Sequence, residues 1–352
     1  MNTSKRIANL DLFRFLAIAL VIYYHIGERF TLDKTIAIGK YGVEMFFVLS
    51  GFLITNIYYK KSEGSNLLRF WLQRFLRTYP PYLAALLISY SAVFFGRGQD
   101  FDPGFLFFFQ NFYQVIPFFK ISWSLCIEEH FYLMFPLVVL LTSRATSSKH
   151  VRLAMWIAIT ITPSFILRYF AGDFQMKEFG YYTTATIFRF DGIALGCTIS
   201  YFINHYSFSL RSNGYISLLF AAVFAGISYW LADVDSQFKY CTGYLFLVFS
   251  AGMLLVSFYY SPDFLLSKTL FVKQIALMAY SLYLTHALIL NVFDKIFHKY
   301  PAFTILAVPI CVTAMLLVGL AFYKTIEAPS ISLRDSLLSF QPWFKKSSRR
   351  PS

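Results

Sequence analysis

Long apolar runs divide this chain, and their length limits what it can fold into. A helix needs about 20 mostly apolar residues to cross the hydrocarbon core of a bilayer, where only helices and closed barrels satisfy every backbone hydrogen bond. Runs of about this length occupy residues 8–27, 39–59, 78–95, 123–142, 151–171, 185–204, 213–232, 240–260, 274–296 and 302–325. The sequence therefore predicts an all-α, polytopic integral membrane protein with about ten transmembrane helices.

Composition favours the same fold class. The 352 residues are 57% hydrophobic and 14% charged, whereas a soluble chain carries about 25% charged residues. The 42 Phe and 25 Tyr residues suit lipid-facing surfaces and the membrane interfaces. The net charge of +13 comes without a nucleic-acid-binding motif, so we expect no nucleic-acid partner. The four cysteines lack metal-ligand spacing, so we expect neither a metal site nor a permanently bound cofactor.

The distribution of Lys and Arg predicts the orientation of the helices. Basic residues concentrate in the cytoplasmic loops of membrane proteins. If the N-terminus is cytoplasmic, the larger share of Lys and Arg falls in cytoplasmic loops and in the C-terminal tail. An even number of spans then places both termini in the cytoplasm. We expect one transmembrane domain over 1–335 and a basic cytoplasmic tail over 336–352, with no soluble domain attached.

One aromatic segment between these runs does not fit a simple span. Residues 104–119 form a short stretch that is interrupted by Gln110, Asn111 and Gln114. Irregular backbone is tolerated at membrane depth only where protein covers it. We therefore predict an interfacial or re-entrant piece packed against the helices.

The first apolar stretch, Leu10–Phe30, carries three ionisable residues that are costly in lipid. Asp11 and Arg14 lie near its start and His25 near its end. A charged side chain at membrane depth costs about 2.5–3.5 kcal/mol or more. Arg14 and His25 are eleven residues apart, which is about three helical turns, so they share one face roughly 16 Å apart. This face offers a fixed cation near one leaflet and a titratable base near the other.

Other polar residues are predicted to lie at similar depths on several helices. Each of them alone is compatible with a buried ion pair or with a helix end that reaches water. Arg189 and Asp191 are two residues apart and fit a structural role as well as a chemical one. Taken together, the set favours a polar cavity that opens outward: His25, Glu44, Glu128, Glu129, Arg189, Asp191 and His286.

Helical spacing indicates which carboxylate faces that cavity. Ser124, Glu128 and Tyr132 recur every four residues and share one face of a helix. We therefore predict that Glu128 faces the cavity and that Glu129 pairs with a neighbouring cation.

Two further segments add candidates at opposite ends of the bundle. His286 follows Tyr283 by one turn; a lone histidine on an apolar face is usually a core residue, but its depth, comparable to that of His25, favours a shared site. Arg74 and Arg77 lie one turn apart near the cytoplasmic end of the third helix. This segment alone favours anchoring to anionic lipid. The arginine fork also suits phosphate, and the position of these arginines beneath Arg14 motivates the hypothesis that they hold a phosphate-bearing cytosolic donor.

Seven short motifs occur in a fixed order: the Arg14–His25 pair, FFVLSGFLI at 46–54, RFLRTYPPY at 74–82, WSLCIEEHFYL at 123–133, RFDGIALG at 189–196, YSLYLTHALIL at 280–290 and IEAP at 326–329. In these motifs the chain resembles the membrane acyltransferase 3 family, which includes O-antigen and exopolysaccharide O-acetyltransferases. The resemblance implies a ten-helix bundle in a bacterial inner membrane. It also implies transfer of an acyl group, usually acetyl from acetyl-CoA, to a hydroxyl of a carbohydrate or other acceptor.

The resemblance gives each candidate residue an expected role. His25 would be the general base or the acyl carrier, and Glu128 would orient its imidazole. Arg14, Arg74 and Arg77 would hold the acyl-CoA donor, and Arg14 would also take part in catalysis. The residues expected to bind the acceptor or to support the site around it are Glu129, Asp191, Tyr283 and His286.

Two rival functions use the same residues. A proton-coupled transporter also needs intramembrane His, Arg and carboxylate groups, but the inverted repeat and the paired broken helices typical of many carriers are not visible in the sequence. A structural partner of a polysaccharide assembly complex would tolerate loss of His25.

Overall fold

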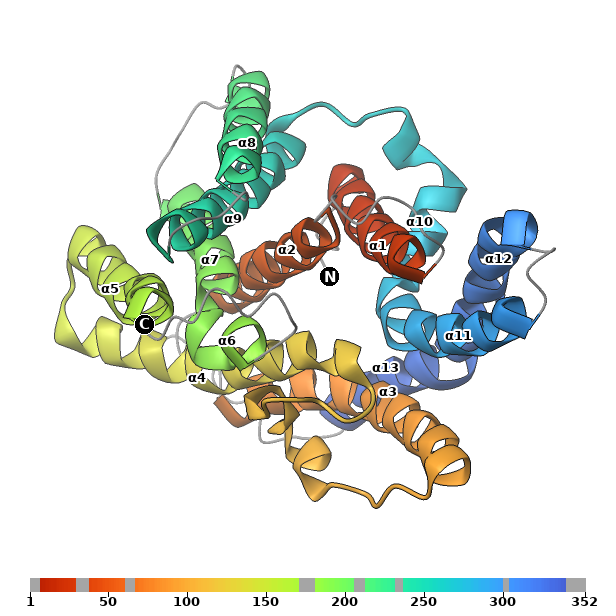
Figure 1. Ribbon diagram of the computed structural model, residues 1–352. Coiled ribbons are helices and arrows are strands. Elements are labelled where there is room, and N and C mark those ends of the chain that lie inside the picture. Colours follow the sequence, from red (N-terminus) through yellow and green to blue (C-terminus); the bar gives the residue numbers. More distant parts are fainter. Residues whose placement is uncertain are drawn as a thin grey trace.

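The computed structural model describes residues 7–29, 38–60, 67–170, 181–205, 213–231, 237–299 and 304–339, and every regular element in these ranges is a helix (Figure 1). The all-α prediction is therefore confirmed for the described residues. The long helices are α1 (Ala8–Arg29), α2 (Ile38–Lys60), α3 (Leu67–Arg97), α4 (Trp123–Ala145), α5 (Lys149–Phe170), α7 (Phe190–His205), α8 (Asn213–Trp230), α9 (Gln237–Tyr260), α11 (Ala279–Lys299), α12 (Thr304–Phe322) and α13 (Ala328–Ser339). The shorter ones are α6 (Tyr181–Thr184), α10 (Leu270–Leu277) and the turns η1 (Pro103–Phe107), η2 (Gln110–Phe112), η3 (Lys120–Ser122), η4 (Thr186–Phe188), η5 (Leu266–Lys268) and η7 (Tyr323–Glu327).

Several of these helices are long and apolar enough to cross a membrane. Within the described ranges six pass a test of length and composition, and a bent pair raises the number to seven. The six are Ala8–Arg29, Leu67–Gly96, Lys120–Ala145, Lys149–Phe170, Phe238–Tyr260 and Val308–Ser339. These helices identify a helical membrane protein, whereas the count of ten stays a prediction.

The ninth predicted span differs from the structure, because it is bent. The run 274–296 is not one straight helix, because α10 and α11 meet at Met278 with a bend of 73°. Composition is continuous across this break, so hydropathy alone could not locate it. The third helix also begins earlier than predicted, at Leu67, and Trp71 in its first turns donates a hydrogen bond to the carbonyl oxygen of Tyr132 (3.2 Å).

The segment 104–119 is packed on protein, as predicted. It forms the short turns η1 and η2 and an irregular stretch that leads to η3. The amide nitrogen of buried Gln110 donates to the hydroxyl groups of Tyr82 and Ser122, both at 3.0 Å. Asn111, also buried, donates to Thr186 Oγ1 (2.7 Å). Two of the three amides that make this segment a poor span, Gln110 and Asn111, therefore attach it to the bundle.

Helices α1 and α2 occupy the middle of the arrangement (Figure 1). Helices α7 and α9 pack against α2, and α10 and α11 pack against α1. Helix α3 lies beside α4 and α13 on a third side.

Two motif glycines explain how closely α2 approaches α7. A Cβ atom added at Gly51 would overlap the carbonyl oxygen of Ile193, and one added at Gly196 would overlap that of Val48. Small residues allow helix backbones to meet in this way in membranes. The FFVLSGFLI and RFDGIALG motifs therefore encode one helix–helix contact.

Two buried ion pairs join further helices around the same contact. Arg189 donates to Glu44 on α2 (2.5 Å), and Arg168 on α5 donates to Asp191 at the start of α7 (2.6 Å). The Tyr244 hydroxyl on α9 donates to Glu44, and the Arg168 guanidinium lies 3.9 Å from the centre of the Tyr244 ring. One connected network thus joins four helices.

We expect Gly51→Leu to lower the stability of the bundle in detergent. The Cβ alone would overlap the carbonyl oxygen of Ile193 on α7, and overpacking of this kind costs about 1–3 kcal/mol or more. Gly226→Ala on α8 is the matched control, since its new Cβ meets nothing within 4 Å. Thermal unfolding followed by size-exclusion chromatography measures both, and equal melting temperatures for the two variants would contradict the close α2–α7 contact.

Breaking the Arg168–Asp191 pair should also destabilise the fold. Asp191→Leu alone leaves a buried guanidinium without its counter-charge, at a cost of about 3–5 kcal/mol. The double variant Arg168→Met, Asp191→Leu removes both charges and should recover most of the lost melting temperature. If the double variant is as unstable as the single one, the pair is not what Asp191 contributes.

Candidate functional site

Two histidines from distant parts of the sequence meet in the bundle. The rings of His25 on α1 and His286 on α11 lie with their centres 5.1 Å apart and their planes at 36°. His286 is fully buried, whereas the His25 side chain is 24% exposed. The structure therefore brings together the two histidines whose predicted depths were comparable.

The carboxylate beside His25 is Glu28, a residue that the sequence analysis did not select. Its Oε2 lies 3.1 Å from His25 Nδ1, and its Oε1 accepts a hydrogen bond from the Tyr24 hydroxyl (2.7 Å). The spacing of the two residues was a signal for this pair, because residues three apart on a helix are neighbours.

Glu128 does not take the place expected for it beside His25. Its two oxygens accept hydrogen bonds from Ser50 (3.2 Å) and Tyr132 (3.0 Å), and no contact with His25 is formed in the described part of the chain. The reason is depth, since Glu128 lies one turn further along α4 than Ser124.

The predicted face of α4 is nevertheless correct. Ser124 lies within hydrogen-bonding distance of the Tyr283 hydroxyl (2.5 Å), and Tyr132 binds Glu128 as described. Tyr283 also donates to the carbonyl oxygen of Ile121 (3.0 Å), and its ring centre is 5.7 Å from that of His286. Tyr283 therefore connects α4 to the histidine pair.

Arg74 and Arg77 lie nearer the predicted cytoplasmic end of the bundle, where Arg74 contacts the face of α4 that carries Tyr132. The Arg74 guanidinium lies 5.3 Å from the centre of the Tyr132 ring. It interacts electrostatically with Glu128, Glu129 and Arg77. Glu129 thus has the neighbouring cation that its spacing predicted.

Glu327 in the IEAP motif joins this cluster to α11. Its Oε2 accepts hydrogen bonds from the Ser281 backbone N–H (3.2 Å) and hydroxyl (2.5 Å), and both Arg77 and Arg14 interact with it electrostatically. Arg14 also lies 3.4 Å from Asp11. Glu327 was not among the predicted site residues, although a carboxylate directly after a long apolar run is itself a signal.

Asp191 forms hydrogen bonds within the protein and is not open to an acceptor. It is fully buried, its carboxylate binds Arg168, and the same side chain accepts the Gly192 backbone N–H (3.1 Å). Asp191 was expected to contact an acceptor. The structure instead gives it a buried ion pair with Arg168 on α5, and this pair occupies its carboxylate.

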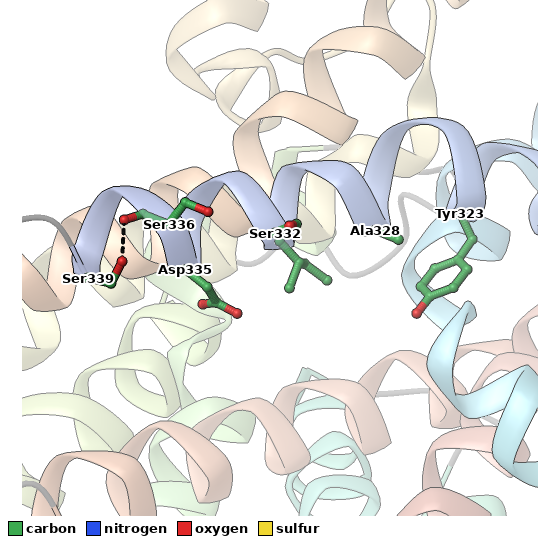
Figure 2. A pocket seen from close by; sticks show the side chains of 7 residues that line it. Tyr323, Ala328, Ser332, Asp335, Ser336 and Ser339 are labelled. Carbon is green, nitrogen blue, oxygen red and sulfur yellow. Dashed lines mark hydrogen bonds between the residues drawn. The ribbon is translucent and has the colours of Figure 1, made fainter.

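A separate hollow of about 510 Å³ runs along α13, and it contains none of these groups. Figure 2 shows Ser332, Asp335 and Ser336 on the helix with Tyr323 at the far end. The hollow borders the η7 segment that carries Glu327, but its own lining offers hydroxyl groups and one carboxylate rather than bases or cations.

Comparison with known proteins agrees with the motif pattern. The family model described as Acyltransferase domain (Acyl_transf_3) matches residues 7–324. The O-acetyltransferase OatA of Staphylococcus aureus (strain NCTC 8325 / PS 47) is 25% identical over an alignment of 320 residues that covers 81% of this chain and 51% of that protein. The peptidoglycan O-acetyltransferase OatA of Listeria monocytogenes serovar 1/2a is 36% identical over 157 residues, 39% of this chain and 24% of that protein.

The chain therefore spans about half the length of the staphylococcal relative. No solved structure shows a significant match. The family match, in contrast, takes in almost every described helix that contributes to the site, from α1 to α12. On that ground the protein belongs to the Acyl_transf_3 family of acyltransferases.

Proposed function

We propose that this protein is a membrane O-acetyltransferase that moves an acetyl group from acetyl-CoA to a hydroxyl of an envelope carbohydrate. Membership in an acyltransferase family supports the reaction type, and the names of the S. aureus and L. monocytogenes relatives support an O-acetyl product. The observation that carries the proposal is the His25–Glu28 pair beside His286, on a helix that Glu327 joins to the arginine cluster.

The arginine cluster suits the donor. Coenzyme A carries phosphates at one end and a thin pantetheine arm at the other, and arginine binds phosphate through its planar fork. Arg14, with a side chain that is 23% exposed, and Arg77 both lie near Glu327. Donor phosphates would meet these cations from the cytosol, while the arm extends toward His25.

The histidine end suits the chemistry. Because the Glu28 carboxylate can only accept a hydrogen bond, the hydrogen of the neutral His25 ring lies on Nδ1 and Nε2 keeps a lone pair. Glu28 also stabilises positive charge that develops on this ring. His25 can therefore act as general base toward the acceptor hydroxyl or carry the acyl group itself.

The proposed topology has ten spans with both termini in the cytoplasm of a bacterial inner membrane. Contacts between α1 and α11 support it. His25 meets His286, and four residues further on Arg29 donates to Asn291 and Asp294 (both 2.8 Å). The two helices therefore run in the same direction, as the first and ninth of ten alternating spans must.

A proton-coupled carrier remains the second candidate, favoured by one observation. The bent pair α10–α11 resembles the discontinuous helices that line carrier sites. Such carriers have a second broken helix in a matching repeat, and the described ranges contain one bent pair.

His25→Ala should abolish acetyl transfer, because no other described base has the Glu28 partner. Loss of a general base costs about 10²–10⁴-fold in rate. Cells producing either form are fed labelled acetate, and label in envelope glycan is counted. Equal incorporation would remove the enzyme proposal, and His25-dependent solute uptake without transfer would establish the carrier.

Arg77→Gln should raise the KM for acetyl-CoA more than the KM for acetyl-pantetheine, which lacks the nucleotide phosphates. A lost charge-assisted hydrogen bond is worth about 1.5–3 kcal/mol, or roughly 10–100-fold. Arg144→Gln at the end of α4 is a control at an exposed position. An equal rise for both donors would show that Arg77 supports the fold rather than the phosphates.

A further inference from the structure

His286 has one ring nitrogen that no partner explains. Its Nδ1 lies 2.8 Å from the Tyr283 carbonyl oxygen and 3.2 Å from that of Leu282, one turn back on α11. Carbonyl oxygens only accept hydrogen bonds, so Nδ1 carries the hydrogen and Nε2 of the neutral ring is a bare acceptor. This Nε2 is buried and has no hydrogen-bond partner among the residues that the structure describes.

A buried acceptor without a partner is costly, and such groups in native proteins call for an explanation. For His286 Nε2 we find this explanation in the neighbouring residue, His25. His25 is held in the same tautomer by Glu28, so its Nε2 also presents a lone pair. Two bases with fixed tautomers therefore stand 5.1 Å apart, measured between ring centres. A reaction with a single general base needs only one of them.

We propose that His286 is a second catalytic histidine of the acyl transfer proposed above, on which this inference rests. His25 Nε2 takes the acyl group from the thioester, and His286 Nε2 takes the proton of the acceptor hydroxyl in the second half of the reaction. Each histidine thus serves one substrate.

The lone pair of His25 Nε2 adds to the thioester carbonyl carbon, the C–S bond breaks, and the thiolate leaves with its electron pair. The acceptor oxygen then attacks the acyl carbon while its proton passes to His286 Nε2. The C–N bond breaks, and its electron pair returns to His25. The proton leaves His286 for water, and the thiolate is protonated there.

Charge explains why the roles are divided in this direction. The acylated His25 ring is positive, and the Glu28 carboxylate lies beside it. In the second step the positive charge moves from His25 to His286, so the pair never holds two charges at once. His286 has backbone carbonyls at its Nδ1 in place of a carboxylate. It is therefore better suited to hold a proton briefly than to carry a lasting charge.

Two substitutions separate this role from a structural one. His286→Asn keeps an N–H donor near the place of Nδ1 and removes Nε2. His286→Gln places an amide oxygen near Nε2 that accepts a hydrogen bond but takes no proton at neutral pH. His205→Asn on α7 is the matched control, because His205 Nδ1 binds its own helix at the Tyr201 carbonyl oxygen in the same way (3.0 Å). Melting temperatures in detergent show which variants fold.

The experiment measures the two half-reactions separately with [¹⁴C]acetyl-CoA. Full-length protein in phospholipid nanodiscs, without glycan, reports coenzyme A release and label retained on the protein in a single turnover. Membrane vesicles that contain envelope glycan report transfer. Both His286 variants should load label within about twofold of the unsubstituted protein and lose transfer by about 10²-fold or more. His25→Asn should lose both, and His205→Asn should lose neither.

Three results would overturn the inference. The first is near-normal transfer by His286→Gln, which would leave His286 a hydrogen-bonding role only. The second is loss of acyl loading in a folded His286 variant. The third is unsubstituted protein that releases coenzyme A only when acceptor is present and retains no label. Failure of the proposed function looks different, since His25→Asn would then transfer acetyl normally.

Discussion

A polar side chain inside the hydrocarbon core must find its hydrogen bonds and its counter-charge within the protein, because lipid offers neither. Here that constraint is met by pairing across helix boundaries. Glu44 on α2 binds Arg189 before α7, and Asp191 on α7 binds Arg168 on α5. These pairs fix how helices distant in the sequence meet. They also bring α2 and α7 close enough for Gly51 to touch backbone.

The same constraint separates groups that hold the fold from groups that react. Asp191 and Arg189 have partners of opposite charge and little exposed surface to offer a substrate. His286 differs, because it has no ion-pair partner among the described residues and its buried Nε2 lies beside the partly exposed His25 ring. These polar residues thus divide by whether the described part of the protein supplies a counter-charge.

Local periodicity explains what the sequence could predict. The helices, the shared face of Ser124 and Glu128, and the meeting of His25 with His286 all follow from spacing and depth along single helices. The offset of one helix against another along their axes does not, which is why Glu128 was expected beside His25 where the structure has Glu28. The bend at the α10–α11 junction was missed for a related reason, since apolar composition does not change there.

The bend between α10 and α11 allows α11 to contact both Glu327 and His25. Because α11 begins anew after Met278, its first N–H groups lack helical acceptors, and the positive end of its dipole favours a carboxylate. Glu327 takes this place at Ser281, among the arginines. Five residues further along, about 7.5 Å up the axis, the same helix brings His286 against His25. The spacing between the Glu327 carboxylate and the histidine pair is therefore set by less than two turns of the helix that Glu327 anchors.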